Sequence, residues 1–175
     1  MNYVYIAASV DGYIATVDGG VDWLDQYPNP EKSDYGYSDF IRSIDAVVMG
    51  RHTFEKVMTF GDWPYDKKAF VLSRFLTTVP DALKGRVELM SGSPEAVVES
   101  INQAGFKDLY IDGGIVIQDF LKHDLIDELT VTRIPVLLGN GIPLFGPLNA
   151  PLRFEHKETT VYNNAFVTSR FARTR

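Results

Sequence analysis

Cysteine is absent from the 175 residues of this chain. Without thiols the protein has no disulfide framework, no thiolate nucleophile and no cysteine-ligated zinc or iron–sulfur site. The three histidines, His52, His123 and His156, do not have the spacing of metal ligands. We therefore expect no metal site, and the lack of cysteine fits a reducing compartment.

Long apolar runs and basic clusters are lacking as well. No segment approaches the roughly 20 apolar residues of a membrane span, and the apolar run at the N-terminus is too short, and has too few basic residues before it, for a signal peptide. The net charge of −6 argues against a surface for nucleic acid or for anionic membranes. We therefore expect a cytoplasmic protein that binds neither nucleic acid nor a membrane.

The chain length suits a single domain over residues 1–175. Short apolar runs recur between turn signals, and runs that are apolar on both faces are typical of inner strands of a sheet covered by helices. The predicted strands are Tyr3–Ala8, Ala46–Met49, Ala69–Leu72, Val87–Met90 and Leu109–Ile111.

Helical patterns lie between these strands, over 37–43 and 53–58, after Ser93, and after a double glycine. Beyond residue 128 the pattern becomes β-rich, over 129–134, 153–160 and 161–173. Asn163-Asn164 marks a hairpin turn. The sequence predicts an α/β fold whose last third is antiparallel.

Two predicted strands end in glycine turns that lead into helices. Ile111-Asp112 runs into Gly113-Gly114, and Val48-Met49 runs into Gly50. A strand, a glycine turn and a helix N-terminus together point backbone N–H groups at a phosphate. Neither turn matches the G-x-G-x-x-G fingerprint. Each turn is therefore either half of a dinucleotide site or an ordinary connection.

Hydroxyl and guanidinium groups accompany these strand ends. Arg51 and Thr53 follow the first turn, and Ser73-Arg74 follows the strand 69–72. A guanidinium offers two parallel donors to a phosphate. Alternatively, Thr53 caps the next helix, Arg51 is a solvated charge and Ser73-Arg74 is a polar turn. Three such strand ends together favour an anion site.

Three carboxylates are candidates for acting on a substrate: Asp11, Asp34 and Asp112. Asp11 lies in an Asp-Gly turn and Asp34 near a helix start, so turn formation or capping also explains them. Asp112 lies between a buried strand and the double glycine, where a partly desolvated acid can orient or protonate a substrate. The aromatic residues of 23–40 either wall a pocket for a flat heterocycle or pack their loop onto the body.

Six ordered motifs, spread over nearly the whole chain, resemble the dihydrofolate reductase superfamily, and most closely the branch that contains the RibD C-terminal domain. They are Ala7-Ala-Ser-Val-Asp-Gly-Tyr-Ile14, Asp45-Ala-Val-Val-Met-Gly-Arg-His-Thr-Phe-Glu55, Val71-Leu-Ser-Arg74, Ile111-Asp-Gly-Gly114, Leu125-Ile-Asp-Glu-Leu-Thr-Val-Thr-Arg-Ile-Pro135 and Leu138-Gly-Asn-Gly-Ile-Pro-Leu-Phe145. The resemblance implies a three-layer fold with a mixed, mainly parallel sheet and an antiparallel C-terminal hairpin.

The resemblance also implies an NADPH site and a homodimer. Ala8 and Ile14 should border the nicotinamide. The implied phosphate ligands lie at Gly50, Arg51, His52 and Thr53, the adenosine ligands at Ser73 and Arg74, and the pyrophosphate ligands at Gly113, Gly114, Ile115 and Val116.

The acid before the double glycine separates the branches of this superfamily. Dihydrofolate reductases usually carry an apolar residue there and RibD domains an acid, and this chain carries Asp112. The leading interpretation is an NADPH-dependent reductase of an aminopyrimidine similar to 5-amino-6-(5-phosphoribosylamino)uracil, or of a related heterocycle. The alternatives are a dihydrofolate reductase and a non-catalytic NADPH-binding module.

Overall fold

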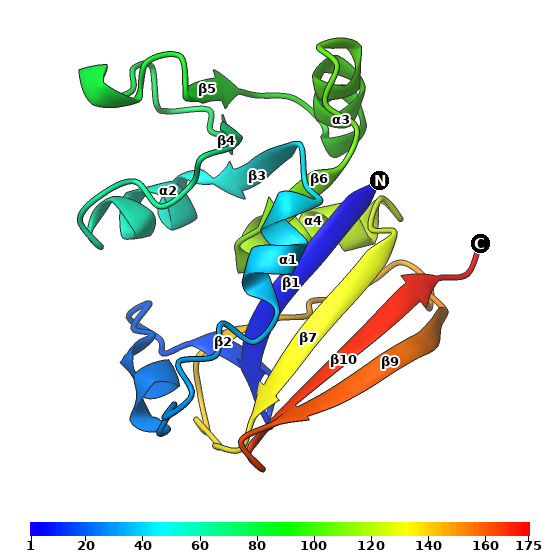
Figure 1. The fold of residues 1–175 in the computed structure, drawn as a ribbon. Helices are drawn as coiled ribbons and strands as arrows, with labels where there is room; N and C mark the ends of the chain where they lie inside the picture. The colour runs from blue at the N-terminus through cyan, green and yellow to red at the C-terminus, as the bar shows by residue number, and fades with distance from the viewer.

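The computed structural model describes residues 1–175 and is organised around one eight-stranded sheet, in the order β5-β4-β3-β6-β1-β7-β10-β9 (Figure 1). Its strands are β1 (Asn2–Ser9), β3 (Ala46–Gly50), β4 (Lys68–Leu72), β5 (Val87–Met90), β6 (Leu109–Asp112), β7 (Glu128–Ile134), β9 (Phe154–Tyr162) and β10 (Phe166–Arg173). A separate two-stranded sheet pairs β2 (Tyr13–Ala15) with β8 (Ile142–Pro143).

The six strands from β5 to β7 are mutually parallel, whereas β10 and β9 continue the sheet as an antiparallel hairpin. The four α-helices are α1 (Tyr37–Arg42), α2 (Arg51–Met58), α3 (Pro94–Gln103) and α4 (Gly114–Lys122), and two short 3₁₀ turns cover Asp22–Gln26 and Asp81–Leu83. None of the helices is long and apolar enough to cross a membrane.

Helices cover both faces of the parallel part of the sheet. Because successive strand residues point to opposite faces, Ala46 and Val48 of β3 enter one core and Val47 and Met49 enter the other. The first core also contains apolar residues of α3 and α4, and the second those of α1 and α2. In Figure 1, α1 lies in front of the sheet and α4 behind it. The predicted three-layer fold is confirmed.

Local sequence explains where the helices begin. Ser93 caps α3 by accepting a hydrogen bond from the N–H of Ala96, and a proline occupies the first turn. The predicted start of the second helix at Thr53 was two residues late, because α2 begins at Arg51 with extended Gly50 (φ −82°, ψ 165°) as its N-cap. Thr53 is therefore not the cap of this helix.

The C-terminal hairpin turns at Asn163 and Asn164, as predicted. Both residues have a positive φ, 53° and 52°, which is the conformation of a two-residue turn that follows the twist of its strands. Asparagine tolerates this conformation better than other residues that carry a side chain. The turn thereby fixes the register of β9 against β10.

Replacing Asn164 with Gly should leave the hairpin intact and change the free energy of unfolding by less than about 1 kcal/mol. Replacing it with Val should lower that free energy by about 1–2 kcal/mol, because a β-branched residue resists positive φ. Urea unfolding of the two variants measures the difference. Equal stability would show that the turn relaxes to another conformation.

Candidate functional site

The carboxyl ends of neighbouring parallel strands form one edge of the sheet. Pairing places Gly50 of β3 opposite Leu72 of β4, and Met49 opposite Asp112 of β6. The helix that follows β3 packs on one face of the sheet, and the helix that follows β6 packs on the other. In open α/β sheets, ligands bind between two neighbouring strands whose following helices pack on opposite faces of the sheet. The edge between β3 and β6 is such a point.

Neither helix at this edge is capped by a side chain. The N-cap residues are Gly50 for α2 and Gly113 for α4, and glycine has no side chain to accept a hydrogen bond. In α4 the N–H of Ile117 bonds to the carbonyl of Gly113 at 2.9 Å, so the N–H groups before it are left for another acceptor. Two uncapped N-termini side by side favour an anion.

Gly113 has a conformation that other residues rarely adopt. Its φ of 90° and ψ of 135° lie near a region populated almost only by glycine. A Cβ at this position would lie 2.1 Å from the Oγ1 of Thr53. The hydroxyl of Thr53 in α2 and the glycine turn before α4 are thus in direct contact.

The neighbouring glycine connects α4 to the first small strand. A Cβ on buried Gly114 would lie 2.7 Å from the Cδ1 of Ile14 in β2. On the other side, a Cβ on Gly50 would lie 3.1 Å from the Cγ2 of Val116. Ala8 is fully buried in the core that also contains Val116. The structure thus sets Ile14, implied for the nicotinamide, against Gly114, and Gly50, implied for a phosphate, against Val116.

The first turn of α4 also presents an exposed side chain at this edge. Ile115 is 69% exposed, although its two neighbours in the helix, Gly114 and Val116, are buried. The side chain of Ile115 therefore faces away from the core, beside the uncapped N–H groups.

The basic residues implied for the phosphates lie on the surface. Arg51 donates to the Oε1 of Glu55 at 3.0 Å and lies 5.9 Å from the ring of Phe75. Exposed Arg74 forms no ion pair in the structure, and exposed His52 faces Glu55 at 3.7 Å. The hydroxyl of Ser73 accepts the N–H groups of Phe75 and Leu76, which shapes the turn that carries Arg74.

Asp112 has the most unusual environment of the three candidate carboxylates. Its Oδ1 accepts the N–H of Gly113 at 2.8 Å, and its Oδ2 accepts the hydroxyl of Tyr65 at 3.2 Å. Like Tyr110 two residues earlier, it points to the face of α1 and α2. Burial of the carboxyl raises the pKa of Asp112, although hydrogen bonds from Tyr65 and Gly113 oppose that shift.

The contacts of Asp11 favour a structural role. Its carboxylate accepts the hydroxyl of Ser9 at 2.6 Å and the N–H groups of Leu138 at 3.2 Å and Gly139 at 2.8 Å. These bonds, the one from Ser9 above all, lower the pKa of Asp11. The ionised carboxylate therefore ties the loop after β1 to the loop after β7.

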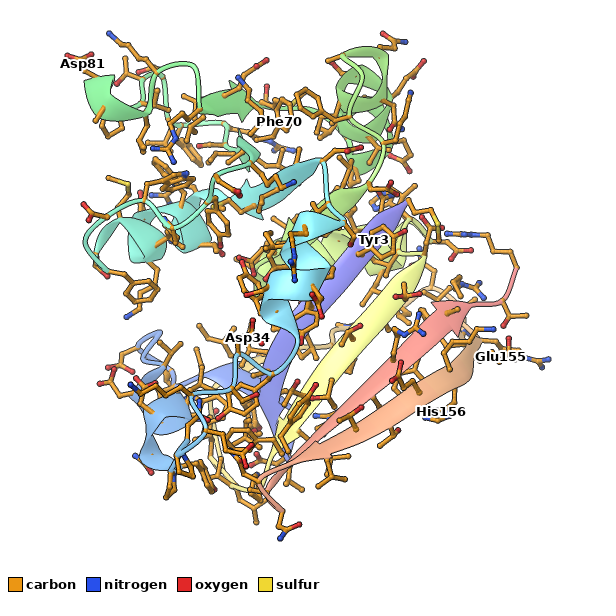
Figure 2. The ribbon with its side chains drawn as sticks, in the orientation of Figure 1. Tyr3, Asp34, Phe70, Asp81, Glu155 and His156 are labelled. Atoms are coloured by element: carbon orange, nitrogen blue, oxygen red, sulfur yellow. The ribbon has the colours of Figure 1, made fainter.

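The contacts of Asp34 also favour a structural role. This exposed residue lies just before α1 (Figure 2). Its carboxylate accepts the N–H groups of Gly36 at 3.0 Å and Ser38 at 2.9 Å. Hydrogen bonding, first from the side chain of Ser38, lowers the pKa of Asp34. The residue thus satisfies orphan N–H groups at the start of α1.

The aromatic residues of the long loop pack into two clusters. Trp23, Tyr27 and Tyr35 pack with Ile134 and Phe166. Tyr37 and Phe40 of α1 pack on the face that also carries Tyr65 and Tyr110. The sequence analysis missed Tyr65, which follows α2 in the run Trp63-Pro64-Tyr65. Aromatic residues in a connection were the available signal.

The fold and the arrangement of this edge define a dihydrofolate-reductase-like α/β domain. Within that class, a family model of the RibD C-terminal domain matches residues 3–168. The chain belongs to the RibD C-terminal domain family.

Solved structures agree with this assignment. A putative riboflavin biosynthesis protein from Shewanella sp. PV-4 is 44% identical, with a TM-score of 0.96 over 99% of both chains. The fold also matches the Thermotoga maritima diaminohydroxyphosphoribosylaminopyrimidine deaminase/5-amino-6-(5-phosphoribosylamino)uracil reductase, at 14% identity and a TM-score of 0.78, over 99% of this chain and 56% of that one. Dihydrofolate reductase from Enterococcus faecalis complexed with NADP(H) matches at 18% identity and a TM-score of 0.68, over 100% and 97% of the two chains.

Replacing Gly113 with Ala should lower the free energy of unfolding by about 2–4 kcal/mol, because it adds backbone strain and a clash with Thr53. Gly105→Ala is the matched control, since Gly105 has a φ of 100° and open space around it. Chemical unfolding of both variants measures the difference. If the two variants lose equal stability, the contact between Gly113 and Thr53 carries no cost of its own.

Proposed function

We propose that this protein is an NADPH-dependent reductase of the RibD type, whose substrate is an aminopyrimidine similar to 5-amino-6-(5-phosphoribosylamino)uracil. The observation that carries the proposal is the pair of uncapped, glycine-led helix N-termini beside the half-buried carboxyl of Asp112. A homodimer remains an expectation from the family resemblance, and a cytoplasmic location remains an expectation from the sequence.

The residues at the sheet edge fit a dinucleotide phosphate. Gly114, the first residue of α4, presents a backbone N–H group without a side chain to obstruct it, and Arg51 and Arg74 add positive charge on an otherwise acidic protein. Ser73 is already used by its own turn, so Arg74 is the better candidate for the 2′-phosphate. When bound, NADPH supplies a hydride to the substrate.

Asp112 is the residue best suited to donate a proton to the substrate. Reduction of a C=N or C=O group requires a proton on the heteroatom, and burial favours the protonated form of this carboxyl. Asp11 and Asp34 are held as ionised acceptors by neighbouring donors. Of the three predicted carboxylates, Asp112 is therefore the one that we assign to the substrate.

Incubation of the purified protein with NADPH and each candidate substrate tests the proposal. Oxidation of NADPH that depends on the aminopyrimidine supports the RibD-type reductase. Oxidation that depends on dihydrofolate instead would move the assignment to a dihydrofolate reductase. NADPH binding without turnover of either would leave a nucleotide-binding module.

The cofactor preference should depend on the surface arginines. Arg74→Ala and Arg51→Ala should each weaken NADPH binding more than NADH binding, since a charge-assisted contact to the 2′-phosphate contributes about 1.5–3 kcal/mol. Arg42→Ala, an exposed arginine of α1, is the control. Titration calorimetry with both cofactors measures the preference, and equal affinities in the unmutated protein would contradict the prediction.

Asp112→Asn should retain NADPH affinity and lower turnover of the aminopyrimidine at least tenfold, about 1.4 kcal/mol in the barrier. Asp34→Asn is the comparison, because the amide oxygen still accepts one of the two N–H groups at this helix start and turnover should be preserved. Steady-state kinetics and cofactor titration of both variants provide the readout. Unchanged turnover in Asp112→Asn would make Asp112 a structural residue of the turn.

A further inference from the structure

Tyr65 is a buried phenol that no role described so far requires. It lies in the connection between α2 and β4 and is only 7% exposed. Its hydroxyl donates to the Oδ2 of Asp112 at 3.2 Å, and the N–H of Gly113 donates to the Oδ1 at 2.8 Å. The carboxyl of Asp112 is therefore held by two donors from two separate segments.

The segment that carries Tyr65 is fixed on both sides. The guanidinium of Arg86 donates to the carbonyl of Tyr65 at 2.7 Å. The Trp63 ring lies 5.3 Å from the Tyr65 ring and 5.7 Å from the Phe54 ring of α2, edge-on in both cases. Because both the backbone and the ring are held, the hydroxyl has little freedom to leave the carboxyl.

The carboxyl of Asp112 has no cationic partner, since it takes part in no ion pair. The groups that face it are the phenols of Tyr65, Tyr110 and Tyr37, from the α2–β4 connection, β6 and α1, and the nearby Arg86 donates to a backbone carbonyl instead. Asp66, which faces Tyr37, adds a further negative charge. An ionised Asp112 would thus be a partly buried anion stabilised by neutral donors alone.

The phenols keep their protons at neutral pH. Burial and the charge of Asp112 raise the pKa of Tyr37 to about 12, and they raise the pKa of Tyr65 further. Tyr65 therefore acts toward Asp112 as a donor and not as a base. Its hydrogen bond favours the ionised form of the carboxyl, against the effect of burial.

We propose that Tyr65 is a positioning residue for Asp112, which fixes the orientation of the carboxyl and stabilises the carboxylate that proton transfer leaves behind. The proposal rests on the proposed reductase function. Bound NADPH would supply the hydride for the carbon of the C=N or C=O group, whose π electrons would move to the heteroatom. That atom takes the proton of Asp112. The carboxylate remains bound to the Tyr65 hydroxyl and the Gly113 N–H until water returns a proton.

Tyr65→Phe removes the hydroxyl and keeps the ring. NADPH affinity should be unchanged, and the turnover number should fall by about tenfold to 100-fold as the carboxyl loses its orientation. Because the Tyr65 hydroxyl stabilises the ionised carboxylate, its removal should raise the pKa of Asp112 by about one unit. Since the reaction uses the protonated acid, activity falls as pH rises through this pKa. The alkaline limb of the pH–rate profile should therefore move to higher pH.

The pKa is measured directly by carbon-13 NMR of protein labelled at the aspartate carboxyls, with the Asp112 signal assigned by its loss in Asp112→Asn. Tyr3→Phe is the matched control. Tyr3 lies near the start of β1, and its hydroxyl contacts a different carboxylate, that of Asp108, at 3.4 Å. An unchanged Asp112 pKa and turnover number in Tyr65→Phe would overturn the proposal while the reductase function stands. If the unmutated protein reduces neither substrate, the reductase function fails, and the NMR titration still decides whether Tyr65 controls the carboxyl.

Discussion

The parallel pairing of β3 with β6, in a register that sets Met49 opposite Asp112, is the constraint on which the candidate site depends. Parallel neighbours end at the same edge, so this pairing brings together two glycine turns that are more than sixty residues apart in the sequence. The helices that follow leave on opposite faces, and their first turns meet where the hydroxyl of Thr53 contacts Gly113. A different strand order would separate these groups.

Local stability is given up at this edge in three ways. Two helices lack side-chain caps, Gly113 has a conformation that other residues avoid, and the carboxyl of Asp112 is half-buried without a cationic partner. Each feature disfavours the folded state when taken alone, and stable domains tend to concentrate such features at functional sites. The capped α3 helix, away from this edge, follows the ordinary rules. This contrast supports the edge between β3 and β6 as the functional site.

Most of the fold could be predicted because its signals are local. Apolar runs mark the buried strands, the Ser93-Pro94 pair marks the start of α3, and Asn163-Asn164 marks the hairpin turn. The start of α2 was misplaced because Thr53 is a good capping residue by type, whereas the backbone becomes helical directly after Gly50. Residue type alone cannot show that the hydroxyl of Thr53 packs against Gly113, at the start of another helix.

The three candidate carboxylates show more clearly the difference between local sequence signals and contacts with distant segments. The sequence identified Asp11, Asp34 and Asp112 as candidates, but their contacts come from segments that no local pattern connects. Asp11 accepts N–H groups from the loop at Leu138 and Gly139, and Asp112 accepts the hydroxyl of Tyr65, 47 residues away. By itself the sequence determined the strands of the main sheet, the glycine turns and the family, because periodicity and motifs are properties of neighbouring residues. The tertiary structure decided which carboxyl is half-buried and which phenol holds it, because burial and hydrogen bonding depend on distant segments that meet only in the folded chain.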